Sequence, residues 1–131
     1  MGPKGPPSFT VRTDRKNGVG RVALEGELDM ATVPVLEEHL AVLEQDRVKA
    51  LVLDLRDLTF VDSTGLHAFL SASQRAVDNG HRFAIVGVTD STRRLFEITG
   101  TERLLDTDDG LRLLEKFTAV EPDKASRTDV A

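Results

Sequence analysis

Hydrophobic and polar residues alternate along the first part of the chain, which is the pattern of half-buried β-strands. Residues 9–13 place Phe, Val and Thr at every second position, and residues 22–28 place Val, Leu, Gly and Leu in the same way. The dipeptide Asn17-Gly18 lies between the two runs and favours a tight turn. The alternation therefore predicts a β-hairpin near the start of the chain.

The pattern then changes to the spacing of an α-helix. Between residues 33 and 43, apolar side chains recur every three or four positions, with glutamates on the other side. Thr32 is a candidate N-cap, and Pro34 fits the first turn, where its missing N–H costs nothing. Residues 49–55 follow as a nearly continuous apolar run, which is typical of an interior strand of a parallel sheet.

The second half of the chain repeats this order. A helical stripe begins at Leu66 and ends at Asn79-Gly80, and a second apolar strand follows over residues 82–88. The stripe consists of Leu66, Phe69, Leu70, Ser73 and Val77.

Shorter elements complete the chain. Asp90 or Ser91 is the candidate cap of a short helix that carries Leu95, Phe96 and Ile98 and stops at Gly100. Leu104 and Leu105 favour a last short strand. Asp108 and Asp109 favour the start of a final helix that continues through Leu111, Leu114 and Phe117.

Strands and helices thus alternate, which predicts an α/β domain with a mostly parallel sheet of about five strands, an antiparallel N-terminal edge strand and about four helices. We expect a flexible leader over residues 1–7, one domain over residues 8–118, and a disordered tail over residues 119–131, where little is apolar.

Composition narrows the classes of function. The formal net charge is -5 and the pI is about 5.2, which argues against broad binding to nucleic acid or anionic membranes. The chain contains no cysteine, and His39, His67 and His81 lie too far apart in sequence to suggest a metal site. No apolar run has the length of a membrane span. We therefore expect a cytoplasmic protein without a cofactor or metal.

The junction between Val61 and the next helix holds an acid, two hydroxyls and a glycine, Asp62-Ser63-Thr64-Gly65. Asp, Ser and Thr are common helix caps, but one cap is enough for one helix. In a parallel sheet, loops at the carboxyl ends of strands carry function. A phosphate on Ser63 would lie at a helix N-terminus, which favours negative charge. Gly65 would keep this loop uncrowded.

Catalytic interpretations of the same residues are weaker. Aspartic proteases use Asp-Thr-Gly or Asp-Ser-Gly with a second carboxylate, whereas one extra residue separates Asp62 from Gly65 here. Ser63 and His67 can share a helix face, but a nucleophile also needs an oriented third group and an oxyanion hole. A response-regulator receiver would use Asp54 and would need an acidic pair after the first strand and a lysine after a later strand, and the chain has neither at those places. Asp54 more plausibly joins a hydrogen-bond network at a strand end.

Three stretches in register resemble the bacterial anti-sigma factor antagonists, which are single STAS domains. They match over roughly residues 8–118 in order and spacing. The stretches are Gly26–Asp29 with Thr32 and Pro34, Leu53–Leu55 continued by Phe60–Leu66, and Arg94–Gly100.

The resemblance implies a STAS fold and a partner-switching function. It implies that an ATP-dependent anti-sigma factor serine kinase phosphorylates Ser63, with Thr64 as the second choice, and that a metal-dependent serine phosphatase removes the phosphate. The unphosphorylated domain would bind the kinase and so release a sigma factor. His67 stands where many members have glycine, which could alter which kinase is recognised.

The residues expected to contact the kinase surround Ser63 or lie in the loop before the first helix. They are Asp29, Met30, Ala31, Thr32, Asp62, Thr64, Gly65 and His67. Asp29 is equally well explained as a cap of the first helix. Leu66, Phe69 and Leu70 are expected in the core. We expect a monomer that binds neither nucleic acid nor membrane.

Two other functions remain open from the sequence. The domain could be a STAS scaffold subunit of a larger signalling assembly. It could also bind or hydrolyse nucleotides weakly, although no glycine-rich phosphate loop is present.

Overall fold

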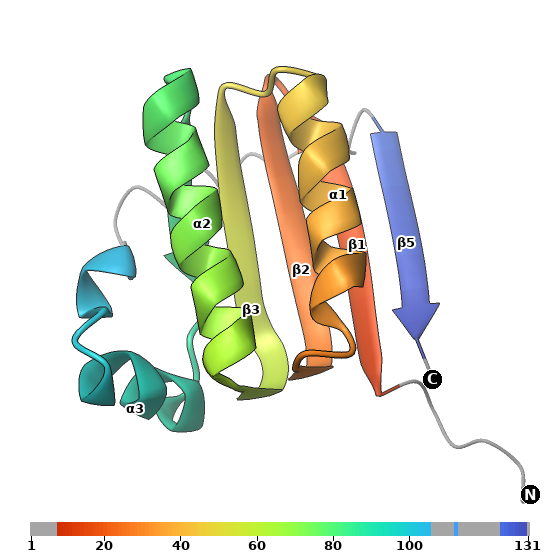
Figure 1. The fold of residues 1–131 in the computed structure, drawn as a ribbon. Helices are drawn as coiled ribbons and strands as arrows, with labels where there is room; N and C mark the ends of the chain where they lie inside the picture. The colour runs from red at the N-terminus through yellow and green to blue at the C-terminus, as the bar shows by residue number, and fades with distance from the viewer. Residues whose placement is uncertain (1–7, 106–111, 113–123, 131) are drawn as a thin grey trace, which may run out of the picture.

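A computed structural model of the chain describes residues 8–105, 112 and 124–130. A five-stranded sheet in the order β4-β3-β2-β1-β5 carries helices α1 and α2 side by side on one face (Figure 1). The strands are β1 (Phe9–Lys16), β2 (Val19–Leu28), β3 (Ala50–Val61), β4 (Arg82–Val86) and β5 (Lys124–Val130). The helices are α1 (Val33–Gln45), α2 (Ser63–Asn79), α3 (Asp90–Ile98) and the 3-10 turn η1 (Glu102–Leu104).

The predicted hairpin is confirmed. β1 and β2 pair antiparallel, with Lys16 opposite Val19 across the turn. Asn17 and Gly18 have φ angles of 52° and 79°, and a two-residue turn with two positive φ angles matches the twist of the flanking strands. The two later strands pair in parallel, β2 with β3 and β3 with β4, because α1 and α2 carry the chain back between them.

The core lies between the sheet and the two long helices. Leu36, Leu40 and Leu43 of α1 are buried, and so are Leu66 and Phe69 of α2, as predicted. The other inward positions of α2 are small, which brings the helix close to the sheet; they are Gly65, Ala68, Ala72 and Ala76. The predicted stripe was wrong at its far end, because Val77 is 73% exposed.

Helix α3 and η1 lie beside α2 (Figure 1). The ring of Phe96 stacks on that of Phe69, with centroids 6.3 Å apart, and this contact joins α3 to the core. Helix α3 begins at Asp90, with Thr89 as the preceding residue, so neither Asp90 nor Ser91 is its cap. The strand expected at Leu104-Leu105 was wrong: η1 ends at Leu104, and Leu105 makes one isolated bridge to Ile85.

The C-terminal segment also differs from the expectation. Lys124–Val130, expected to be disordered, forms β5 and pairs antiparallel with β1, so that β1 is not an edge strand. The backbone pairing of β5 with β1 supplies a hydrogen-bond ladder, and a polar sequence gives no signal that predicts such pairing. The His39 ring in α1 hydrogen-bonds the Thr128 hydroxyl at 2.7 Å, and burial lowers the pKa of His39, partly offset by Glu38. The expected leader, the final helix apart from Arg112, and residues 119–123 and 131 lie outside the described residues.

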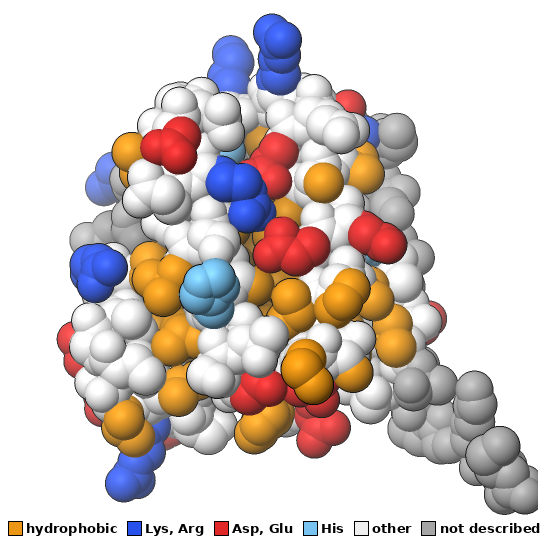
Figure 2. Space-filling view, in the orientation of Figure 1, with side chains coloured by type: hydrophobic (Ala, Val, Ile, Leu, Met, Phe, Trp, Pro, Cys, Tyr) orange, Lys and Arg blue, Asp and Glu red, His pale blue; other side chains and the backbone are white. Residues whose placement is uncertain are grey.

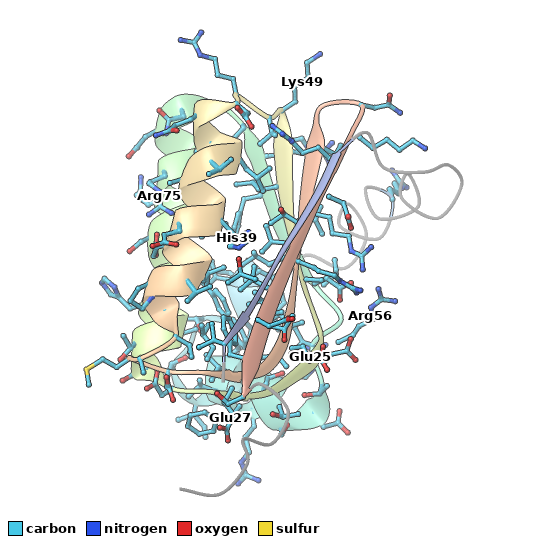
Figure 3. The ribbon with its side chains drawn as sticks, turned by 90° about the vertical axis from the view of Figure 1, so that its right-hand side faces the viewer. Glu25, Glu27, His39, Lys49, Arg56 and Arg75 are labelled. Carbon is cyan, nitrogen blue, oxygen red and sulfur yellow. The ribbon has the colours of Figure 1, made fainter. Side chains whose placement is uncertain are left out.

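The sheet face opposite α1 and α2 carries an ionic network around Asp54. Because β3 continues to Val61, Asp54 lies within the strand and not at its end. Its carboxylate is 3% exposed and accepts hydrogen bonds from the Nε and Nη2 atoms of Arg56, while Arg21 lies 3.4 Å away. Figure 3 shows Arg56 on this side of the sheet. The hydrogen bond and charge of Asp54 raise the pKa of Arg56.

In the part of the chain that the structure describes, no helix combines the length and apolar character needed to cross a bilayer.

We expect Asp54→Ala to lower the free energy of unfolding by about 2 to 3 kcal/mol, because it removes the buried carboxylate that Arg21 and Arg56 share. Urea unfolding would measure the loss. The control is Asp57→Ala on the same strand, where the carboxylate is exposed, and its effect should stay within about 0.5 kcal/mol. Equal losses in both variants would contradict a structural role for the Asp54 network.

Candidate functional site

Two loops meet where β2 and β3 end. Leu28 and Val61 are register partners at the carboxyl ends of these parallel strands. The backbone N–H of Asp62 donates to the carbonyl of Leu28 at 3.1 Å, so the pairing continues into the loop. The Asp29 loop before α1 and the Ser63 junction before α2 therefore lie next to each other.

Asp62 is the N-cap of α2. Its backbone is extended, with φ −97° and ψ −174°, and its Oδ1 accepts a hydrogen bond from the Gly65 N–H at 2.9 Å. This contact satisfies one of the N–H groups that an α-helix leaves free at its start. The capping function is thus carried by the acid alone, and it does not require either hydroxyl of the junction.

Ser63 is the first residue of α2, and its side chain is exposed. Among the described residues, no group hydrogen-bonds its hydroxyl. No base is therefore placed to activate it as a nucleophile in this structure, although His67 lies one turn further along the same helix. The remaining free N–H groups of the first turn and the helix macrodipole favour a negative charge on this side chain.

Gly65 is buried, which changes the role expected for it. A Cβ at this position would lie 2.6 Å from Cγ2 of Val61 and 2.9 Å from Cδ2 of Leu28. The absence of a side chain lets the first turn of α2 pack directly on the ends of β2 and β3. Gly65 therefore positions Ser63 and does not offer a contact to a partner.

The loop before α1 is held by reciprocal hydrogen bonds between Asp29 and Thr32. Oδ1 of Asp29 accepts from the N–H groups of Ala31 and Thr32, at 3.0 and 3.1 Å. The Thr32 hydroxyl accepts from the Asp29 N–H at 2.9 Å and donates to the Glu27 carbonyl at 3.0 Å. Asp29 is thus a turn cap, whereas Thr32 is 5% exposed and makes no side-chain cap of α1. Thr32 therefore holds the loop in shape, and it is too buried to contact a partner as expected.

The exposed members of the expected contact set lie around Ser63 and on the Asp29 loop. Met30 is 75% exposed, and Ala31 and His67 are also exposed, while Asp29, Asp62 and Thr64 are half-buried. Figure 2 shows hydrophobic and acidic side chains together at the lower edge of the molecule, where β2 and β3 end. Exposed apolar patches rimmed by polar residues are typical of protein-binding surfaces.

Phe60 is a member of this edge that the sequence analysis did not select. It is 47% exposed and is the register partner of Glu27 near the end of β3. Its position next to the inward-facing Val61 gives the signal that could have identified it, since neighbouring strand residues point to opposite faces. Phe60 therefore points to the sheet face opposite α1 and α2, whereas the exposed Met30 lies on the loop of Asp29, next to the junction that Asp62 begins.

We expect Asp62→Ala to lower the free energy of unfolding by about 1 kcal/mol, because the Gly65 N–H loses its acceptor. Asp62→Asn keeps an acceptor oxygen and should lose less than half as much. Thermal and urea unfolding of both variants would measure the difference. If Asp62→Asn lost as much as Asp62→Ala, the negative charge and not the hydrogen bond would be the contribution of this residue.

We expect Gly65→Ala to cost about 1 to 3 kcal/mol, because the added methyl group overlaps Val61 and Leu28. The matched test is the double variant Val61→Ala with Gly65→Ala, in which the nearest overlapping atom is gone. Its cost should be less than the sum of the two single costs in urea unfolding. Strictly additive costs would show that the contact with Val61 is not the source of the strain.

Comparison with known proteins agrees with this geometry. A family model of the STAS domain matches residues 10–113. The anti-sigma-B factor antagonist of Staphylococcus aureus is 35% identical over 103 residues, which cover 79% of this chain and 95% of the relative.

Solved structures give the same result. An anti-sigma factor antagonist from Mycobacterium paratuberculosis superposes with a TM-score of 0.72 at 29% identity, covering 86% of this chain and 99% of that one. The unphosphorylated form of the anti-sigma factor antagonist SpoIIAA, with a TM-score of 0.69 and 15% identity, covers 84% and 97% of the two chains and shows the shared fold. The family match and the sequence identity together show that this chain belongs to the STAS domain family and is similar to the anti-sigma factor antagonists.

Proposed function

We propose that this chain is an anti-sigma factor antagonist that works by partner switching. In its unphosphorylated form it binds an anti-sigma factor that is also an ATP-dependent serine kinase, and this binding frees a sigma factor. The kinase then phosphorylates Ser63, and a metal-dependent serine phosphatase resets the domain. The identity to the Staphylococcus antagonist over most of both chains supports this function.

The observation that carries the proposal is the division of roles at the start of α2. Asp62 caps the helix, while the neighbouring Ser63 hydroxyl is exposed and makes no hydrogen bond among the described residues. A hydroxyl with this exposure can enter a kinase active site without local unfolding. Thr64 is half-buried, which supports Ser63 as the acceptor.

Charge supplies the switch. A phosphate adds about 1.5 to 2 negative charges at neutral pH. It would stand next to Asp62 and close to the Asp29 loop, on a surface that also buries Met30 when the partner binds. Repulsion and the desolvation of the phosphate would cost several kcal/mol, and about 2.8 kcal/mol already weakens binding 100-fold. The helix N-terminus accommodates the anion, so the domain itself need not refold.

The test is intact mass spectrometry after incubation with ATP and the anti-sigma factor kinase encoded nearest to the gene of this chain. We expect one added phosphate on the wild type and on Thr64→Ala, and none on Ser63→Ala. Circular dichroism of the two variants would verify that both are folded. A phosphate on Ser63→Ala would move the acceptor elsewhere. No phosphate on a wild type that this kinase nevertheless binds would leave a binding module without the proposed switch.

A further inference from the structure

A groove runs between α2 and η1, on the side of α2 away from α1. Its volume is about 490 Å³, and it begins beside His67 and ends beside Val77. The side chains that matter for its chemistry are His67, Leu70, Val77, Arg103 and Leu104. No role in the fold described above accounts for this groove.

The groove runs along a side of α2 that borders the core, and its floor is formed by Leu104 of the core and by Leu70, which packs partly against it. Its lining positions on α2 include His67, Leu70, Ser71, Gln74 and Val77, spaced by three or four residues so that they share one helical face. The fully buried positions of α2, from Gly65 to Ala76, lie on its other side. Val77 is left 73% exposed, and Leu70 is half-buried, so the groove offers apolar surface that nothing described in this chain covers.

The charged residue in the lining of the groove is Arg103, and Asp78 lies at its border, where it accepts a hydrogen bond from the lining Gln74 at 3.0 Å. The chain has 22 acidic and 17 basic residues, yet the ionisable side chains that line the groove are His67 and Arg103, with no carboxylate among them. Arg103 is exposed and makes no ion pair among the described residues. Figure 2 shows hydrophobic side chains together with basic and histidine side chains over this part of the molecule. An apolar side chain next to a carboxylate would be complementary to this lining.

Size and position indicate whose side chains these would be. A stable protein interface buries about 800 Å² on each partner, which corresponds to about 20 to 30 residues a side. The few residues that line the groove do not provide such an interface alone. The groove begins one helical turn from Ser63, so it continues the surface on which the kinase is proposed to bind. It therefore extends that interface and does not form a separate one.

We propose that the groove between α2 and η1 is a second contact for the anti-sigma factor kinase, which places an apolar side chain between Leu70 and Val77 and a carboxylate against Arg103. This inference rests on the proposed function. Val77 lies about 20 Å along the helix from Ser63, at 1.5 Å per residue, which is more than two Debye lengths at physiological salt, about 8 Å each. The groove would therefore set the affinity and the choice of kinase, while the phosphate on Ser63 would set the switch.

The test compares two exposed valines. Val77→Asp places a negative charge in the groove, and Val42→Asp is the control, since Val42 is 52% exposed in the last turn of α1 and does not line the groove. Both substitutions put an acid near a helix C-terminus, so their costs to the fold should match. We expect calorimetry with the kinase to show at least tenfold weaker binding for Val77→Asp and for Arg103→Glu, and less than a twofold change for Val42→Asp.

A second comparison separates affinity from switching. Ser63→Glu should weaken binding by the same factor in the wild-type and Val77→Asp backgrounds, because the two sites are far apart. If wild type binds and Val77→Asp binds equally well, the groove inference is wrong and the proposed function stands. If wild type neither binds the kinase nor is phosphorylated by it, the proposed function itself fails. If the free wild type sediments as a dimer and free Val77→Asp sediments as a monomer, the groove binds a second copy of this chain and the inference is overturned.

Discussion

The parallel pairing of β2 with β3 is the interaction on which the candidate site depends. It brings Leu28 and Val61 into register and continues through the bond from the Asp62 N–H to the Leu28 carbonyl. Each strand ends there and passes directly into the loop that starts a helix. Two segments separated by about 30 residues of chain thus become one surface, and neither loop could hold this position without the other strand.

Capping and exposure are assigned to different residues at this surface. The carboxylates of Asp62 and Asp29 accept hydrogen bonds from backbone N–H groups, and Gly65 and Thr32 are buried. These four residues hold the loops, so that Ser63 and Met30 can remain exposed without loss of order. A rigid support of this kind suits a switch in which one added charge changes binding while the backbone stays in place.

The two faces of the sheet are stabilised by different physics. Leucine and phenylalanine side chains fill the face under α1 and α2, whereas the other face combines the ionic network of Asp54, Arg21 and Arg56 with a small apolar cluster of Val19, Ala50, Val52 and Val86. Helix α2 belongs to both the core and the candidate site. One side of it packs in the core, its first turn carries the exposed Ser63, and another side lines the groove. A single amphipathic helix can serve three purposes because 3.6 residues per turn distribute its side chains over the whole circumference.

The sequence by itself determined the elements that follow from local rules. Period-two alternation and Asn17-Gly18 predicted the hairpin, helical spacing predicted α1 and α2, and the Asp62–Gly65 junction predicted where α2 starts, next to the proposed acceptor Ser63. Only the tertiary structure decided that Val77 is exposed and Phe60 is on the surface, that Gly65 and Thr32 are buried, and that Lys124–Val130 joins the sheet. These outcomes depend on which face of an element finds a partner and on backbone pairing between distant segments, and a pattern of side chains along one chain contains neither.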